Sequence, residues 1–574
     1  MNRFIFIIIV AFILTGFQGC KKDYLDITPN GRIALADIFK DPNQTAAYLN
    51  SAYGNIQEYG GHYFFHTMMA GFSDEAHDND DPTENTPVTA WYNGGLTPNY
   101  NPLDNGGWMG NYYGNNWTGI RKCNVFINNI DAATVNNPND KARWKAEAKV
   151  LRAFYYWDLI LRYGPMPIVE KPFELTSDFA SLTRPTFDSC VQFIVKDCNE
   201  AIAESALPYR ITTDPDRGRF TKAIAYAIKC DALLFNASPL WNPANDKTKW
   251  QAASTATQEA ITNLTTQSNY GLFPNYGTYF ITTPDISANP ADKETILEMK
   301  NNGNISIWQF LSGAPSVRAY KAGVSPSQEL VDAYEMADGT IPITGYSDAD
   351  HLQPLINAAS GYNDANPYLN RDPRFYSTVF YNGGLYGNIN GGTYYLQSYV
   401  GGKDGLLATD RHYTHNSYYI HKFVNGDLTD VQGSGAKFRK WRMAGLYLAL
   451  AEAENEANGA TPIALAAVNK VRARVNMPPL AGLTQDQFRD RVHNERRVEL
   501  SFEEARFWDV RRWKVLDKTD KLTTGMRWIK NGTAFTNTRF VVDRRKSFDT
   551  KFLIWPIPLS EISVLPKFVQ NPGW

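Results

Sequence analysis

The sequence predicts a mainly α-helical protein, in which a scaffold of paired helices carries a loop-rich half with short strands. Several long segments repeat apolar side chains at helical spacing, and the stretches between them are dense in Gly, Asn, Asp and Tyr. No Ser-rich, Pro-rich or charged linker divides the 574 residues. We therefore expect residues 20–574 to form one large domain, whose parts 20–330 and 331–574 are intertwined.

The N-terminus has the pattern of an export signal. Arg3 precedes the apolar run 4–14, which is too short to span a bilayer but suits the apolar core of a signal peptide. Residues 1–19 are therefore interpreted as a signal peptide. Gly19 and Cys20 follow, and the segment resembles the lipobox of bacterial lipoproteins, in which the cysteine becomes lipid-modified. Phe17 and Gln18 depart from that pattern, and the alternative is an ordinary secretory signal.

Four helices are predicted in the first half of the chain, and the clearest covers residues 140–164. There, apolar side chains fall on one stripe at spacings of three and four, and Gly164 and Pro165 end the helix. Similar patterns predict helices near 115–131, 186–204 and 219–236. We expect Trp117, which begins one of these patterns, to lie in the core.

The second half contains a predicted antiparallel helix pair, 440–458 and 462–478. The pair spans about the 34 residues of a tetratricopeptide unit, although the consensus of that repeat is only loosely met. A third helical block begins at Thr484, which forms a capping box with Gln487, and runs through "FRDRVHNERRVELSFEEARFWDVRRW". The scaffold is thus predicted to be tetratricopeptide-like.

Two stretches, 59–114 and 340–435, lack this periodicity. Runs such as "GGTYYLQSYV" and "NSYYIHKFV" indicate brief strands bounded by turns. The chain holds 32 Tyr and 14 Trp, and many of them fall in these Gly-rich and Asn-rich stretches. Loops on a rigid helical base commonly carry binding residues, so we expect the ligand-binding half here.

Charge and cysteine content exclude some functions. The chain has 57 Lys and Arg residues against 59 Asp and Glu, so it lacks the excess of positive charge that binding to nucleic acid would require. Besides Cys20, the chain has four cysteines that all lie in helical patterns: Cys123, Cys190, Cys198 and Cys230. None of them forms a CxxC pair, which argues against a zinc-binding site. We favour buried thiols, with a disulfide from Cys190 or Cys198 to Cys230 as the alternative.

Six ordered segments together identify a family. They are "EAKVLRAFYYWDLILRYGPMPIV", "GRFTKAIAYAIKCDALLFNASPLWN", "PSQELVDAYEMADG", "RDPRFYSTV", "NERRVELSFEEARFWDVRRW" and "LIWPIPLSEISVLPKFVQNPGW". With the lipobox-like start, they resemble the SusD/RagB family of outer-membrane nutrient-binding lipoproteins. The resemblance implies a tetratricopeptide-like core and a loop-rich binding half, as the residues themselves suggest.

The resemblance also implies a function and a location. Such a protein captures glycans, or in some members peptides, at the surface of a Gram-negative cell and delivers them to a SusC-like TonB-dependent β-barrel transporter. It is held on the outer membrane through a lipid on Cys20, and it has neither a catalytic role nor a cofactor. Clustered Trp residues in loops favour glycan over peptide.

Candidate ligand-binding residues follow from this resemblance and from the aromatic loops. Family members bind ligand just downstream of a segment resembling "GFSDEAHD". In this chain, two Gly-rich segments follow that position and are expected to be exposed loops: "PVTAWYNGGL" and "DNGGWMGNYYG". We predict Asp74 as a polar contact and Trp91 and Trp108 as the main stacking platforms. Tyr92 and Asn93 are weaker candidates, and Trp308 is a candidate for a further stacking platform. The alternative for each Trp is a buried anchor that pins its loop.

Two other kinds of site are disfavoured. His62 and His66 are spaced to share a helix face, but "HYFFH" lacks the HExxH glutamate, and aromatic packing is favoured over a metal. The acidic run 73–85 lacks the spacing of a calcium loop. The charged cluster Glu495, Arg496, Arg497, Glu499, Glu503 and Glu504 is interpreted as an ion-pair network rather than a glycosidase site, since no catalytic motif accompanies it. A lipid-anchored hydrolase remains the least favoured alternative.

Overall fold

The computed structural model describes most of the chain. The described residues are 35–57, 68–79, 86–104, 110–174, 176–283, 285–287, 290–299, 312–317, 322–428 and 436–574. The predictions for Cys20, Trp108 and Trp308, and the alternative metal pair His62 and His66, therefore lie outside the described residues.

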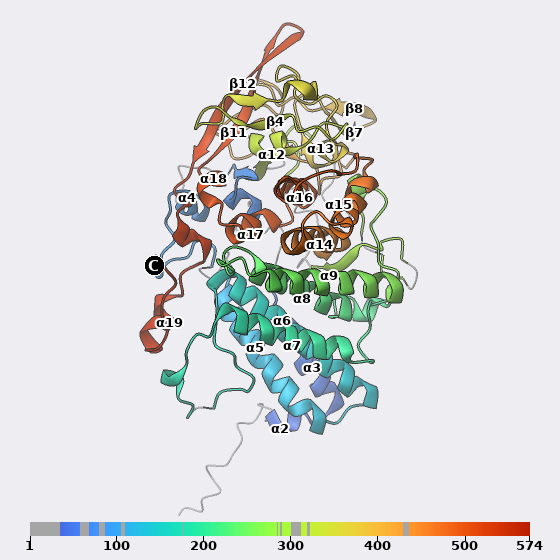
Figure 1. Ribbon diagram of the computed structural model, residues 1–574, viewed down its shortest axis with the longest axis vertical. Coiled ribbons are helices and arrows are strands. Elements are labelled where there is room, and N and C mark those ends of the chain that lie inside the picture. The colour runs from blue at the N-terminus through green and yellow to red at the C-terminus, as the bar shows by residue number, and fades with distance from the viewer. Residues whose placement is uncertain are drawn as a thin grey trace, which may run out of the picture.

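A layer of long helices forms the base of the molecule (Figure 1). Consecutive helices pack against one another, and the layer comprises α3 (Pro42–Tyr53), α5 (Tyr112–Asn129), α6 (Pro138–Tyr163), α7 (Phe187–Ala203), α8 (Lys222–Ala237) and α9 (Lys247–Ser268). Four of them confirm the predicted helices, and α6 ends at Gly164 with φ of 71°, as its sequence indicated. The helix α9 was not predicted, because its Ser-rich and Thr-rich sequence has a weak apolar stripe.

A second group of helices lies on this base. It comprises α14 (Met443–Asn458), α15 (Pro462–Arg474), α16 (Gln485–Glu499) and α17 (Ala505–Arg512), and α14 packs against α8 and α9. The capping box of Thr484 and Gln487 is confirmed. The helical block after it is not continuous, however: Phe502 and Glu504 have positive φ and separate α16 from α17. The predicted helix 440–458 also starts late, because Arg439–Arg442 form strand β10.

The remaining part is loop-rich and carries short helices and strands, as predicted. Its strands form antiparallel pairs within the described residues: β1 (Ala76–Asp78) with β3 (Val324–Pro326), β2 (Thr295–Glu298) with β10, β4 (Ile343–Tyr346) with β5 (Pro354–Ile356), β6 (Val379–Phe380) with β9 (Tyr419–Ile420), β7 (Leu385–Ile389) with β8 (Gly392–Tyr395), and β11 (Leu522–Asn531) with β12 (Ala534–Arg544). The short helices of the described chain are α2 (Leu35–Ile38), which lies beside α3 at the helical base (Figure 1), and α4 (Pro87–Tyr92), α10 (Tyr276–Tyr279), α12 (Gln328–Ala333), α13 (Pro373–Thr378), α18 (Leu516–Thr519) and α19 (Leu559–Val564).

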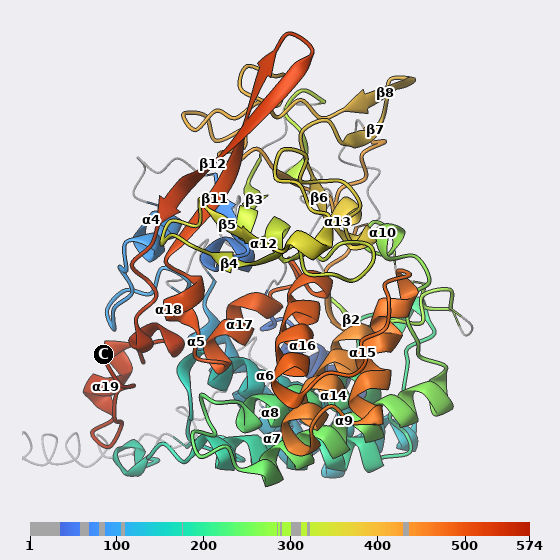
Figure 2. The ribbon, with the colours of Figure 1, turned by 45° about the horizontal axis from the view of Figure 1, so that its top comes forward.

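The hairpin of β11 and β12 was not predicted, and Figure 2 shows it projecting beyond the loop-rich part. Its two-residue turn consists of Gly532 and Thr533, and Gly532 has φ of 64°. Glycine at the first position of a two-residue turn is a hairpin signal, so the sequence did carry part of the information.

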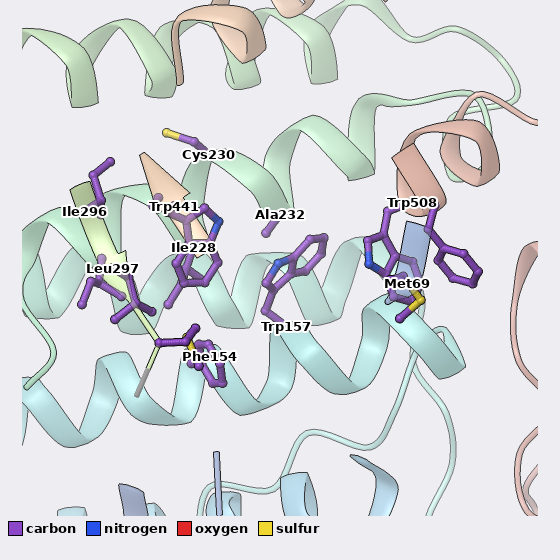
Figure 3. Packing of buried hydrophobic residues seen from close by; sticks show 14 of the residues in the cluster. Met69, Phe154, Trp157, Ile228, Cys230, Ala232, Ile296, Leu297, Trp441 and Trp508 are labelled. Atoms are coloured by element: carbon purple, nitrogen blue, oxygen red, sulfur yellow. The ribbon is translucent and has the colours of Figure 1, made fainter. Parts of the chain in front are cut away.

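The core joins helices to strands from distant parts of the chain. Phe154 and Trp157 of α6 face Ile228 and Ala232 of α8, while Trp441 of β10 and Leu297 of β2 close one end of the row (Figure 3). Phe154 and Trp441 form an edge-to-face pair with ring centroids 6.0 Å apart. The pairing of β2 with β10 thus fixes part of the second half of the chain onto the first helical layer.

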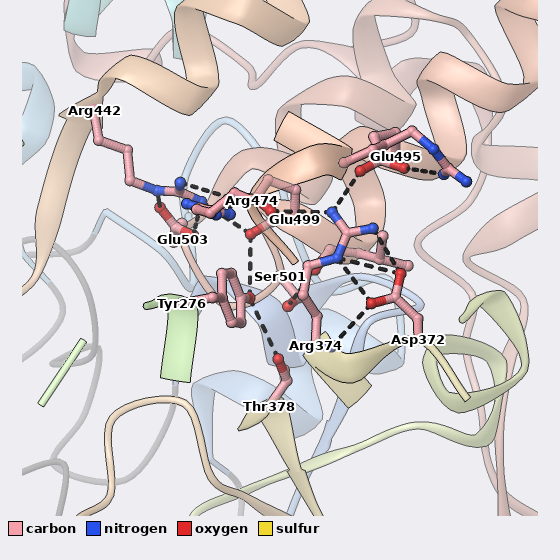
Figure 4. A network of polar contacts seen from close by, with 12 residues as sticks. Tyr276, Asp372, Arg374, Thr378, Arg442, Arg474, Glu495, Glu499, Ser501 and Glu503 are labelled. Atoms are coloured by element: carbon pink, nitrogen blue, oxygen red, sulfur yellow. Dashed lines mark hydrogen bonds and ion pairs between the residues drawn. The ribbon is translucent and has the colours of Figure 1, made fainter. Parts of the chain in front are cut away.

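A buried ion-pair network links α16 to several other segments (Figure 4). Glu499 accepts hydrogen bonds from Arg442 (2.7 Å), Arg474 (2.5 Å) and Arg374 (3.0 Å). Burial alone would raise the pKa of Glu499, but these arginines hold it well below its usual range. The interpretation of this charged cluster as an ion-pair network is therefore confirmed, and Glu495 joins it through Arg374 and Arg472.

The four cysteines of the described residues are buried free thiols, as favoured, and no disulfide joins Cys190 or Cys198 to Cys230. In the described part of the chain, no helix combines the length and the apolar character needed to cross a bilayer.

Candidate functional site

Asp74 is a structural anchor in this fold. It lies in the turn between the 3₁₀ helix Met69–Phe72 and β1, and its carboxylate accepts two hydrogen bonds of 2.8 Å from Arg506 and one of 2.8 Å from Arg497. Burial opposes ionisation, yet Arg497 and Arg506 lower the pKa of Asp74 to about 2. Asp74 is 3% exposed and both of its carboxylate oxygens accept hydrogen bonds from arginines, so its burial argues against the predicted polar contact with a ligand.

The expected exposure of Trp91 is wrong. The residue lies in α4, which Thr86 caps and Pro87 begins, and its side chain is 0% exposed. Its ring packs against Phe72, Phe507 and Phe552, with centroids 5.8 to 5.9 Å apart. The Gly-rich sequence that follows Trp91 suggested an open loop, but aromatic residues from the C-terminal part cover it. The alternative of a buried anchor describes Trp91 correctly.

Tyr92 and Asn93 differ in exposure. The Tyr92 hydroxyl donates to the carbonyl of Gly71 (2.7 Å) and accepts from the amide of Asp78 (3.1 Å), and the Arg545 guanidinium lies 4.3 Å from its ring centroid. Burial raises the pKa of Tyr92 well above its usual value. Asn93 caps the end of α4 and is exposed. Of the described candidates, only Asn93 offers its side chain freely to solvent.

A different part of the molecule contains a large cavity. It has a volume of about 930 Å³ and lies between the end of α3, the loop 215–220, β2 and Lys437; we call it the α3–β2 cavity. Binding sites for small ligands commonly have volumes of about 300 to 1,000 Å³. Residues of this cavity were not among the predicted site residues.

The walls of the α3–β2 cavity combine aromatic, amide and charged groups. The Arg217 guanidinium forms a two-pronged pair with Glu298, in which Nη2 lies 3.2 Å from Oε2. Tyr53 packs edge-on against Phe220, with ring centroids 5.5 Å apart, and Arg219 donates to the amide oxygen of Asn50 over 2.8 Å. Rigid rings and polar groups of both kinds suit a ligand with apolar faces and many hydroxyls.

The cavity is close in sequence to the two undescribed tryptophan candidates. The amide of Asn111, which follows the segment containing Trp108, donates to Gln57 Oε1 in the cavity wall over 3.3 Å. Met299, another wall residue, is the last described residue before the segment containing Trp308. The charged turn "DPDRGRF", which supplies Arg217 and Arg219 to the cavity wall, was not among the segments predicted to bind ligand.

The described acidic and histidine residues near Asp74 do not gather as a metal site. His77 Nδ1 lies 2.5 Å from Asp543 Oδ2, and His77 Nε2 lies 3.3 Å from His415 Nδ1. No group of three or more His, Cys, Asp or Glu side chains arranged to hold a metal ion occurs among the residues that the structure describes.

Comparisons with known proteins agree over nearly the whole chain. The chain is 24% identical over 482 residues to a SusD-like protein, P25, of Formosa agariphila, covering 79% of this chain and 76% of that one. A solved SusD-like protein of Bacteroides fragilis superposes with a TM-score of 0.76 at 24% identity, covering 95% of this chain and all of the other. A SusD-like carbohydrate binding protein of the same species gives a TM-score of 0.68 at 23% identity, covering 92% and 99%.

These likenesses establish the fold, and the predicted fold class is confirmed. Family models extend the agreement to the sequence. The model described as "SusD family" matches residues 293–574, and the model described as "Starch-binding associating with outer membrane" matches residues 24–230. The chain belongs to the SusD family.

Proposed function

We propose that this protein is a cell-surface glycan-binding lipoprotein that takes up oligosaccharides at the α3–β2 cavity. The observation that carries this proposal is the match of both parts of the chain to SusD-family models, one of them described as starch-binding and associated with the outer membrane. One solved relative is itself named a carbohydrate binding protein. Bound glycan is then delivered to a SusC-like TonB-dependent barrel, without catalysis by this protein.

The cavity supports an oligosaccharide as the ligand. Sugar rings present C–H faces that pack on aromatic rings and hydroxyls that need donors and acceptors around their edges. Tyr53 of α3, Arg217 of the loop 215–220 and Glu298 of β2 supply a ring, a guanidinium and a carboxylate to the cavity. We assign the stacking role to Trp108 and Trp308, whose segments follow on from this wall in sequence.

The location completes the proposal. A lipid on Cys20 holds the domain at the outer membrane, and the 14 residues between Cys20 and Leu35 connect the lipid to the first described helix. Multiple acyl chains are needed for stable anchoring, as a bacterial lipoprotein carries.

A binding screen tests the ligand class. The purified protein is titrated with a panel of polysaccharides and with peptides of mixed composition, and binding is followed by calorimetry. We expect at least one polysaccharide to bind. Binding of peptides alone would favour peptide capture on the same scaffold, and turnover of any glycan would revive the hydrolase alternative.

A matched pair of variants then locates the site. Arg217→Gln removes a guanidinium from the cavity, and Arg544→Gln removes one from an exposed two-pronged pair with Asp350 on another surface. A hydrogen bond from a charged group contributes about 1.5 to 3 kcal/mol, so affinity should fall roughly 10- to 100-fold in the first variant only. Equal affinities of both variants and the wild-type protein would place the site elsewhere.

A further inference from the structure

An apolar groove shares none of its lining residues with the α3–β2 cavity. It has a volume of about 550 Å³ and runs between α5, the loop 167–182 and the C-terminal segment that begins with α19. Its walls are mainly aromatic and aliphatic, and include Tyr113, Trp117, Phe173, Phe179, Val564 and Phe568. Trp117, which we expected in the core, is only partly buried and faces this groove.

Large apolar side chains stand out into solvent on both sides of the groove. Their exposed fractions are 37% for Ile168, 43% for Phe179, 45% for Leu559, 67% for Val564 and 73% for Val569. Scattered exposure of single apolar residues is ordinary, but a cluster beside an apolar groove indicates an interaction surface.

The flanking segments are fixed in place. Arg184 donates to the carbonyls of Pro165 and Val569, both over 2.7 Å, and to the Asn571 side chain over 2.8 Å. This one guanidinium therefore ties the loop on one side of the groove to the C-terminal segment on the other. Phe173 and Phe179 stack edge to face, with centroids 4.9 Å apart. The apolar surface is thus preformed and does not depend on a partner to create it.

The path of the chain indicates what this surface meets. Phe39, next to α2, packs against Phe126 of α5 with ring centroids 6.0 Å apart, so the N-terminal segment joins the domain on the helix that forms the floor of the groove (Figure 1). From Phe126 to Trp117, α5 rises by only about 14 Å. The segment from Cys20 to Leu35 spans at most about 50 Å when fully extended. A lipid on Cys20 keeps this face within reach of the bilayer.

Charge at the groove favours the same partner. Two basic residues, Arg121 and Lys171, line it beside the aromatic residues, against a single acidic residue, Glu561. Aromatic side chains settle at the boundary between headgroups and acyl chains, and nearby basic side chains are attracted to lipid phosphates.

We propose that the groove and its apolar rim form a membrane-contact surface that seats the domain on the phosphate-bearing lipids of the outer membrane. Val564, Val569 and Phe179 enter the headgroup region, while Arg121 and Lys171 face the phosphates. The inference rests on the lipid anchor of the proposed function, and it adds a second point of attachment that fixes which face of the domain turns to the membrane.

The test uses the full lipidated protein in vesicles of phosphatidylethanolamine and phosphatidylglycerol that contain a nitroxide-labelled lipid. Ser563→Cys places a fluorescent label beside Val564, and Thr533→Cys places the same label at the turn of the β11–β12 hairpin as a control. Both positions are exposed, and the four native cysteines of the described residues are buried, so labelling is selective. We expect a blue shift and quenching at residue 563 and neither at residue 533.

A second variant separates contact from mere tethering. Phe179→Asp combined with Val564→Asp places charges on two exposed side chains, so the fold and the anchor should be retained while quenching at residue 563 is lost. If the protein floats with the vesicles but the label at residue 563 is not quenched, the membrane-contact surface is refuted while the lipid anchor stands. The same conclusion follows if a dimer of the protein, rather than lipid, shields that label. Failure of the wild-type protein to float would overturn the anchor, and this inference with it.

Discussion

Replacement of Trp91 by alanine is the sharpest test of how this fold is held together. The side chain is 0% exposed and packs against Phe72, Phe507 and Phe552, with the Arg511 guanidinium 5.5 Å from its ring centroid. Phe507 and Phe552 belong to the C-terminal part, so Trp91 joins segments more than four hundred residues apart. Its removal leaves a cavity where the two ends of the chain meet.

The expected loss of stability can be worked out from this burial. Truncation of a buried Trp to Ala typically lowers the free energy of unfolding by about 3 to 5 kcal/mol. The entropy of unfolding is about 2.1 cal/mol/K per residue, or roughly 1.2 kcal/mol/K for 574 residues, so the melting temperature should fall by about 2.5 to 4 °C. Differential scanning calorimetry measures this directly.

A matched aromatic control makes the result interpretable. Phe535 is 41% exposed near the tip of the β11–β12 hairpin, and Phe535→Ala should change the free energy of unfolding by no more than about 0.5 kcal/mol. If Trp91→Ala melts like the wild-type protein, the ring is not the anchor that we describe, and a ligand-contacting role for Trp91 would regain support.

Three further predictions concern buried charges and the anchor. Burial raises the pKa of Glu75 from 4.5 to about 7, so between these pH values the folded protein keeps a proton that the unfolded chain loses. The free energy of unfolding of the wild-type protein should therefore fall by about 3 kcal/mol as the pH rises from 4.5 to 7. Urea unfolding at a series of pH values should show this fall for the wild-type protein and not for Glu75→Gln. Glu499→Gln leaves Arg374, Arg442 and Arg474 without their shared carboxylate, so a loss of about 3 to 5 kcal/mol is expected, and an unchanged urea midpoint would contradict the network. Cys20→Ala should yield a folded protein that no longer floats with outer membranes, whereas retained flotation would argue against the lipid anchor.

Much of the helical scaffold could be predicted because it is encoded locally. The stripe of α6 and its Gly164 stop, and the Thr484 capping box of α16, depend on residues within one or two turns of each other. The helix α9 escaped this reasoning because its buried stripe uses Ala, Ser and Thr, including Ser254 and Thr257, which resemble a polar surface in sequence.

The candidate site was harder to predict, because exposure is a property of the assembled chain. Trp91 sits in a Gly-rich and Asn-rich stretch that would be exposed if nothing covered it, but Phe507 and Phe552 do cover it. Asp74 likewise gains its arginine partners from residues 497 and 506. Local composition therefore could not distinguish buried anchors such as Trp91 and Asp74 from side chains that are free to contact a ligand.

The shared carboxylate of Glu499 also constrains how the protein can fold and evolve. Its three arginines come from α13, β10 and α15, and a buried charge left without its partner is strongly destabilising. During folding, water can therefore be excluded from around Glu499 only when α13, β10 and α15 have all packed against α16. We expect α16 to dock late and together with them. For the same reason, a chimera that exchanges α16 with a relative will fold only if the incoming helix meets arginines at matching positions.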